Sequence, residues 1–175
     1  MQTPGTRPKP PMRGTIAVLL ACATSAALAC DFPGLDAAAD LALHAMETTL
    51  VQAAPDRGRA PTIVPDRPWE VELHPKETVS FIRPPGRDAE PATHAGLLRF
   101  RVPAAGRWRL ALSDGSWVDL VDQDQMVPSA SHGGDGRCTR MHKVVDFDLP
   151  AAREVIIQVS GARAARLRLS LRAVQ

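Results

Sequence analysis

The chain has 175 residues, of which 21 are basic, 19 are acidic and 45% are hydrophobic. This length suits one domain with additional segments and is sufficient for a substantial core. The near balance of charges excludes the strongly basic surface that nucleic-acid binding requires.

Residues 1–29 are predicted to be a secretory signal peptide. Arg7, Lys9 and Arg13 precede a short apolar run over residues 16–29, which ends in A-L-A. A basic start, an apolar centre and small terminal residues are typical of a cleaved signal, and the run is shorter than the roughly 20 residues of a membrane span. Cleavage leaves about 146 residues, 18 basic and 19 acidic, in the periplasm or outside the cell.

Cys30 follows the predicted cleavage site, and two fates are open to its thiol. The sequence A-L-A-C resembles a bacterial lipoprotein box, which implies a lipidated N-terminus and the only membrane contact that we expect. Alternatively, Cys30 and Cys138 are the two cysteines left after cleavage, and such a pair in an oxidising compartment predicts a disulfide. Both outcomes use the same sulfur atom.

One short amphipathic helix is expected in the N-terminal segment, residues 30–54. From Asp36 to Ala54 apolar residues recur every three or four positions, as on one face of a helix. Asp40, His44 and Glu47 occupy the opposite side, which we expect to face solvent. Residues 55–68 contain four prolines and are predicted to form a linker or an extended crossing strand.

Residues 69–175 are predicted to form a β-sandwich domain, because the hydrophobic period changes to two. About eight strands are expected, over residues 69–73, 79–82, 98–102, 107–112, 117–121, 145–149, 155–159 and 167–171. Tight turns join most of them, so the expected fold is all-β: an antiparallel β-sandwich or jelly roll preceded by the signal peptide and the helix.

Side chains on these strands divide into an expected core and an expected solvated surface. Trp108 shares its face with Leu110 and is expected in the core, whereas Trp117 begins its strand and is a candidate for a sugar-stacking surface. The polar positions are expected to be solvated; they include Arg99, Arg101, Arg107, Arg109, Asp146 and Asp148.

The long connection over residues 119–142 carries the candidate metal ligands. His132, Asp135, Cys138 and His142 supply groups that bind zinc, copper or iron. The alternatives are a calcium site built on Asp119, Asp122 and Asp124, or a structured loop without metal, because turns alone explain its glycines. Ser131, His132 and Asp135 are too close in sequence to predict a hydrolytic triad.

The block F-R-V-P-A-A-G-R-W-R-L-A-L, from residue 100, is similar to the F-x-V-x-x-x-G-x-Y/W-x-L-x-L pattern of secreted bacterial β-sandwich modules such as pre-peptidase C-terminal domains. Residues 145–161 look like their closing hairpin. The resemblance covers roughly residues 69–175 and implies an accessory, ligand-binding and non-catalytic module.

A narrower resemblance involves S-W-V-D-L-V-D, S-x-S-H-G and C-x-x-x-H-K-V-V-D-F-D-L-P. These stretches are similar to short secreted proteobacterial proteins, some of which carry the label homogentisate 1,2-dioxygenase, a non-haem iron activity. Such iron sites need two histidines and a carboxylate on one metal face. The H-x-H of a cupin barrel does not occur in this sequence.

The sequence therefore favours a secreted or periplasmic, non-catalytic β-sandwich. It is expected to bind a small ligand or an envelope partner, and no nucleic acid, through the edge formed by residues 119–142. The alternative is a small metal-dependent enzyme that uses His132, His142 and either Cys138 or an aspartate.

Overall fold

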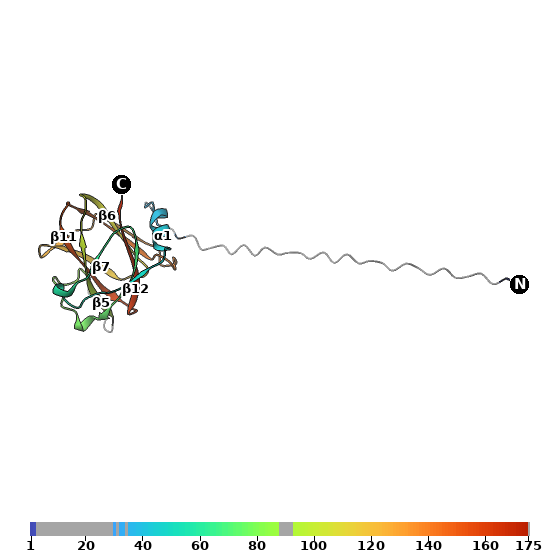
Figure 1. Cartoon of the computed structure of the whole chain (residues 1–175), viewed down its shortest axis with the longest axis horizontal. Helices are drawn as coiled ribbons and strands as arrows, with labels where there is room; N and C mark the ends of the chain where they lie inside the picture. Colours follow the sequence, from blue (N-terminus) through green and yellow to red (C-terminus); the bar gives the residue numbers. More distant parts are fainter. Residues whose placement is uncertain (3–29, 31, 34, 88–92, 175) are drawn as a thin grey trace.

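Two curled β-sheets face each other in the computed structural model, which describes residues 1–2, 30, 32–33, 35–87 and 93–174 (Figure 1). The first sheet has the order β1 (Thr49–Gln52), β3 (Pro68–Glu72), β12 (Arg166–Val174), β6 (Gly106–Leu112), β10 (Lys143–Leu149) and β9 (Ser131–Gly134). The second has the order β2 (Thr62–Ile63), β5 (His94–Arg101), β11 (Glu154–Ala162), β7 (Trp117–Asp122) and β8 (Gln125–Val127), and β4 (His74–Pro75) also pairs with β5. Residues 3–29 of the predicted signal peptide lie outside the described residues.

The main core lies between the two sheets and follows the period-two pattern of the strands. Leu110 and Leu112 of β6 and Phe147 of β10 face Phe100 of β5 and Ile157 of β11 across this core. Trp108 is also buried here, with its ring 5.0 Å from that of Phe100 in an edge-to-face arrangement. The predicted all-β sandwich and the predicted core position of Trp108 are confirmed.

The strands agree with the sequence except where a strand is short or irregular. Seven of the eight predicted strands are present, but residues 79–82 follow the 3-10 helix η2 (Lys76–Thr78) as an irregular segment. Within the described residues, β1, β2, β4, β8 and β9 are additional strands of two to four residues. Such short strands have too few alternating positions to be recognised, and they exist because a longer neighbour offers backbone hydrogen bonds.

The predicted helix over residues 36–54 is wrong in its second half. The helix α1 covers only Ala38–His44, and Thr49–Gln52 form β1, which pairs in parallel with β3. Thr49 and Val51 are β-branched, and such side chains favour extended backbone. Pairing with β3 supplies the hydrogen bonds that a longer helix would have made internally.

The prediction of which face of α1 is buried is also wrong. Asp40 and His44 are about 1% exposed, whereas the predicted apolar stripe leaves Met46 and Leu50 largely exposed. The helix lies on the outer face of the first sheet, against β12 (Figure 1). That outer face carries arginines, so the acidic side of the helix is the side that fits it.

Arg109 of β6 is the centre of a buried network beneath α1. The prediction that Arg109 and Asp146 face solvent is therefore wrong. Its guanidinium donates to Asp146 Oδ1 and Oδ2 at 2.6 and 2.8 Å and to Asp40 Oδ2 at 3.0 Å. Arg172 of β12 donates to both oxygens of Asp40, at 2.6 and 2.8 Å. Charges can be buried here because each one has hydrogen-bonded partners of opposite sign.

The network shifts the proton affinities of its members. Hydrogen bonding to Asp146 raises the pKa of Arg109. Burial alone would raise the pKa of Asp146, but hydrogen bonds from Arg109 and Ser131 outweigh it and keep that pKa below its ordinary value. The outermost pair, Arg107 with Asp148, is exposed as predicted and joined at 2.9 Å.

The N-terminal segment is fixed to the first sheet by a second, smaller core and by a disulfide. Phe32 and Met141 are buried in this core, and Cys30 is bonded to Cys138 across 108 residues. Leu35 packs against Gly133 of β9, where a Cβ would lie only 2.6 Å from its Cδ1. Of the two fates predicted for Cys30, the structure has the disulfide.

The outer face of the second sheet is covered by residues 55–60 and 79–83. The predicted linker contains the 3-10 helix η1 (Arg57–Arg59) and the strand β2, and Ala60 packs on Ile156. Gln158 of β11 is fully buried; its side chain accepts from Ile82 N at 2.8 Å and donates to Arg83 O at 3.1 Å. Ser160 is the next residue of β11 on the same face of the strand as Gln158.

Candidate functional site

The predicted transition-metal ligands do not converge. The Cys138 sulfur is bonded to Cys30 and is therefore not available as a thiolate, while His132 is exposed on β9. Asp135 is buried, and its Oδ1 accepts from Arg137 N at 2.9 Å and Nε at 3.2 Å. Among the described residues, no three His, Cys, Asp or Glu side chains form a group that could hold a metal ion.

The three acids considered for calcium also have separate partners. Asp119 accepts the Trp117 indole N–H, Asp122 accepts from Arg153, and Asp124 pairs with Arg57. Calcium requires several oxygen ligands around one point. These carboxylates instead each neutralise or orient a neighbouring side chain.

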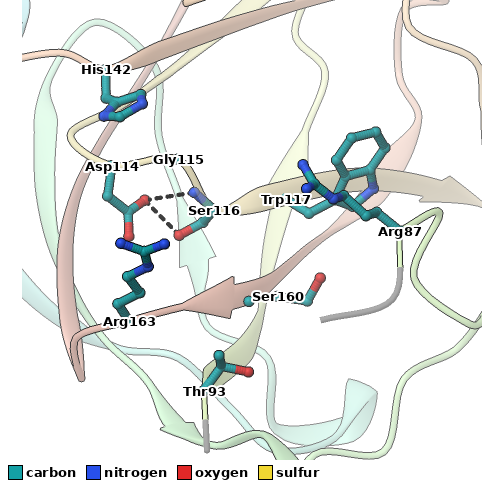
Figure 2. Close-up of a pocket in the computed structure, with 10 residues that line it drawn as sticks. Arg87, Thr93, Asp114, Gly115, Ser116, Trp117, His142, Ser160 and Arg163 are labelled. Carbon is teal, nitrogen blue, oxygen red and sulfur yellow. Dashed lines mark hydrogen bonds between the residues drawn. The ribbon is translucent and has the colours of Figure 1, made fainter. Parts of the chain in front are cut away.

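An open pocket of about 490 Å³ lies at one end of the sandwich (Figure 2). The turn before β7, the end of β11 and the residue before β10 meet here, together with Arg87 and Thr93. The lining residues are Arg87, Thr93, Asp114, Gly115, Ser116, Trp117, His142, Ser160, Gly161 and Arg163. Its volume lies within the roughly 300–1,000 Å³ that small-molecule sites usually occupy.

The turn before β7 is held by its own aspartate. Asp114 Oδ1 accepts hydrogen bonds from the backbone N–H of Ser116, at 3.1 Å, and from the Ser116 hydroxyl. Lys143 Nζ donates to the carbonyl oxygen of Ser116 at 3.1 Å. These bonds fix one wall of the pocket in place without a ligand.

Trp117 is half-buried and forms the opposite wall. Its indole N–H donates to Asp119 Oδ1 at 2.8 Å, and Asp119 Oδ2 accepts from Gly86 N at 3.0 Å. Lys143 Nζ lies 4.5 Å from the ring centroid, within range of a cation–π interaction. Burial, and then the nearby Arg87, lower the pKa of Lys143, while Asp119 and Asp114 oppose the shift.

Ser160 forms the floor of the pocket. It is about 1% exposed, and its hydroxyl oxygen has no hydrogen-bond partner among the described residues. The register between β11 and β5 shifts between Val159 and Ala162, and Gly161 has a φ of 71°, a backbone conformation that favours glycine. The pairing of β11 with β5 is therefore irregular at Ser160 and Gly161, which both line the pocket.

His142 belongs to both the predicted loop and the pocket. Its half-buried ring lies beside Gly115 and Gly136, where added Cβ atoms would be 3.5 and 3.6 Å from Nε2. Its backbone N–H donates to Leu112 O at 2.7 Å, which aligns it with the end of β6. The imidazole is therefore placed at the pocket rim by two turns.

Most of the pocket was missed by sequence reasoning, which placed the functional edge at residues 119–142. Only His142 of that stretch lines the pocket, together with Trp117, the predicted candidate for a sugar-stacking surface. Two signals were present in the sequence: the D-G-S turn at residues 114–116, and the S-G pair that interrupts the apolar alternation of β11. Arg87 and Arg163 carry no local signal, because only the fold brings them together.

The chain matches no protein-family model and no curated protein. In the part of the chain that the structure describes, no helix is both long and apolar enough to cross a membrane. The class is therefore defined by the fold: an all-β, sandwich-like protein with one short helix.

Proposed function

We propose that this protein is a secreted or periplasmic, non-catalytic β-sandwich that binds a small polar ligand in the pocket lined by Trp117, Ser160 and His142. The observation that carries the proposal is the buried Ser160 hydroxyl, which faces the pocket and has no partner among the described residues. A ligand atom in the pocket would supply the missing partner.

Energetics favour a role for this hydroxyl in binding. A buried polar group without a hydrogen bond costs about 1–3 kcal/mol of stability. An alanine at the same position would avoid this cost without changing the backbone. The serine is therefore better explained by an interaction made only in a complex than by the stability of the ligand-free fold.

Hydrogen bonds within the protein already hold the walls of the pocket, which also supports binding. Trp117, Asp119 and Gly86 form a chain of hydrogen bonds, and the Asp114 carboxylate fixes the opposing turn. A site formed before the ligand arrives loses less conformational entropy on binding. Among the described lining residues Asp114 is the one carboxylate, and its Oδ1 already accepts two hydrogen bonds from Ser116.

Secretion is supported by the predicted signal peptide and by the Cys30–Cys138 disulfide. Disulfides persist in oxidising compartments such as the periplasm and are rare in the cytosol. The likeness to secreted accessory modules points to the same location and to the same non-catalytic role.

Nuclear magnetic resonance of the three tryptophan indole N–H groups tests the proposal. The oxidised protein without its signal peptide is titrated with pools of small polar metabolites. A ligand in the pocket shifts the Trp117 resonance, while those of Trp108 in the core and Trp69 on β3 stay in place as internal controls. Pools that move all three resonances equally, or none, would contradict the proposed site.

A further inference from the structure

We infer that the ligand of this pocket carries an oxyanion, a carboxylate or a phosphate, which binds between Arg163 and Arg87 and accepts a hydrogen bond from Ser160. This inference rests on the proposed function and specifies the chemical class of the ligand. Three features of the pocket lead to it: two arginines without an ion pair to a described residue, the positive charge that they give the lining, and the Ser160 hydroxyl at its floor.

Arg87 and Arg163 differ from most arginines of this protein. Ion pairs occupy Arg57, Arg59, Arg99, Arg107, Arg109, Arg137, Arg153, Arg166 and Arg172. Arg87 and Arg163 are exposed, both line the pocket, and neither has an ion pair within the described ranges. A guanidinium presents parallel N–H donors whose spacing matches the two oxygens of a carboxylate or phosphate.

The charge balance of the lining is positive. Of the described residues that line the pocket, only Asp114 carries a carboxylate, and one of its oxygens already accepts two hydrogen bonds from Ser116. Lys143, which lies on the Trp117 ring just outside the pocket, adds a further positive charge. A cleft lined mainly by one sign of charge concentrates ligands of the opposite sign.

The floor supplies a donor between the two arginines. Figure 2 shows Ser160 between Arg163 on one side and Arg87 with Trp117 on the other. Because the Ser160 hydroxyl has no acceptor among the described residues, its proton can be donated to a bound oxygen. Hydrogen bonds to an ionised acceptor are roughly twice as strong as those between neutral groups.

Calorimetric titration of the oxidised mature protein tests the inference with three probes: inorganic phosphate, acetate and the neutral glycerol. We expect phosphate or acetate to bind with a Kd on the order of 1 mM and the affinity to fall as sodium chloride is raised. Glycerol should give no heat of binding. The tighter of the two anions identifies the source of the oxyanion.

Matched variants assign the binding to this pocket. Arg163→Gln is expected to weaken anion binding about tenfold, and Ser160→Ala to weaken it several-fold. Arg101→Gln, which changes an exposed arginine at the opposite end of β5, should leave the affinity unchanged. Anion binding that Arg101→Gln weakens as much as Arg163→Gln would overturn the inference, as would no binding of either anion.

The failure of this inference can be distinguished from the failure of the proposed function. If neutral metabolites shift the Trp117 indole resonance while phosphate and acetate do not, the pocket binds ligands but not by an oxyanion. If neither neutral nor anionic compounds shift that resonance, both the site and its ligand class are wrong.

Discussion

The Asp40 carboxylate lies 3.0 Å from the Arg109 guanidinium, and both side chains are buried where α1 meets the first sheet. Through Arg109 the contact continues to Asp146, and through Asp40 it continues to Arg172. Helix, β6, β10 and β12 are therefore joined by one network of charge-assisted hydrogen bonds.

Asp40→Asn is predicted to destabilise the protein by about 3–5 kcal/mol, because loss of one partner leaves buried arginines without compensation. The free energy of unfolding, from urea denaturation at neutral pH, measures the loss. Asp148→Asn is the matched control: it breaks the exposed pair with Arg107 and should change stability little. Equal effects of the two variants would contradict the buried network.

His44 predicts a loss of stability in mild acid. Burial first, and then the charge of Arg168, lower its pKa from 6.5 to about 4, with Asp40 opposing the shift. The unfolded chain therefore binds a proton more readily than the folded one as pH falls from 6.5 to 4. Over this window the protein should lose about 3 kcal/mol of stability, and none of this loss occurs above about pH 7.

This dependence of stability on pH is attributed to His44 alone, so a substitution at His44 should remove it. His44→Asn retains a polar group for the Ser170 hydroxyl, which lies 3.0 Å from His44 Nδ1, but does not titrate. Urea denaturation at several pH values should show a flatter profile between pH 6.5 and 4 in this variant. A variant profile as steep as that of the parent protein would assign the acid sensitivity to other groups.

Reduction of the Cys30–Cys138 disulfide is expected to lower the free energy of unfolding by about 4–5 kcal/mol, because the bond closes a loop of 108 residues in the unfolded chain. Because the disulfide fixes the N-terminal segment, its reduction should accelerate amide hydrogen exchange in residues 35–47. Exchange in β11 should not change. Thiol labelling of the protein without residues 1–29 should find no free cysteine. A lipid on Cys30, detected by mass spectrometry, would contradict the bond directly.

The sandwich was predictable because long strands repeat the same alternation many times. In β12, for example, the alternation of Leu167, Leu169 and Leu171 correctly predicts the face that lies in the core. The orientation of α1 was not predictable in this way, because its partner surface is itself charged. The hydrophobic pattern of a helix predicts its buried face only where the neighbouring surface is apolar. Here the neighbouring surface carries Arg109 and Arg172, which bind the acidic side of the helix.

The candidate site was less predictable than the fold. The disulfide was one of the two predicted fates of Cys30, because only Cys30 and Cys138 follow the predicted signal peptide. The pocket instead combines residues 87, 93, 114–117, 142, 160, 161 and 163. No local pattern links such distant residues, and a missing hydrogen bond, as at Ser160, is visible only in three dimensions.

Two equally buried serines offer a comparison that needs no ligand. Ser160→Ala removes an unpartnered hydroxyl and should raise the free energy of unfolding by about 1 kcal/mol. Ser170→Ala removes the partner of His44 and should lower it by about 1 kcal/mol. Changes of opposite sign in the free energy of unfolding, measured by urea denaturation, would support a binding role for Ser160. Equal decreases in the two variants would mean that the Ser160 hydroxyl has a hydrogen-bond partner in the free protein.

The most direct test of the central claim is a crystal structure of the protein with phosphate or acetate bound. The account predicts an anion in the pocket beside Trp117, with one oxygen within about 3 Å of Ser160 Oγ and another within hydrogen-bond distance of the Arg163 guanidinium. A pocket that stays empty at saturating anion, or an anion bound only elsewhere on the surface, would contradict it.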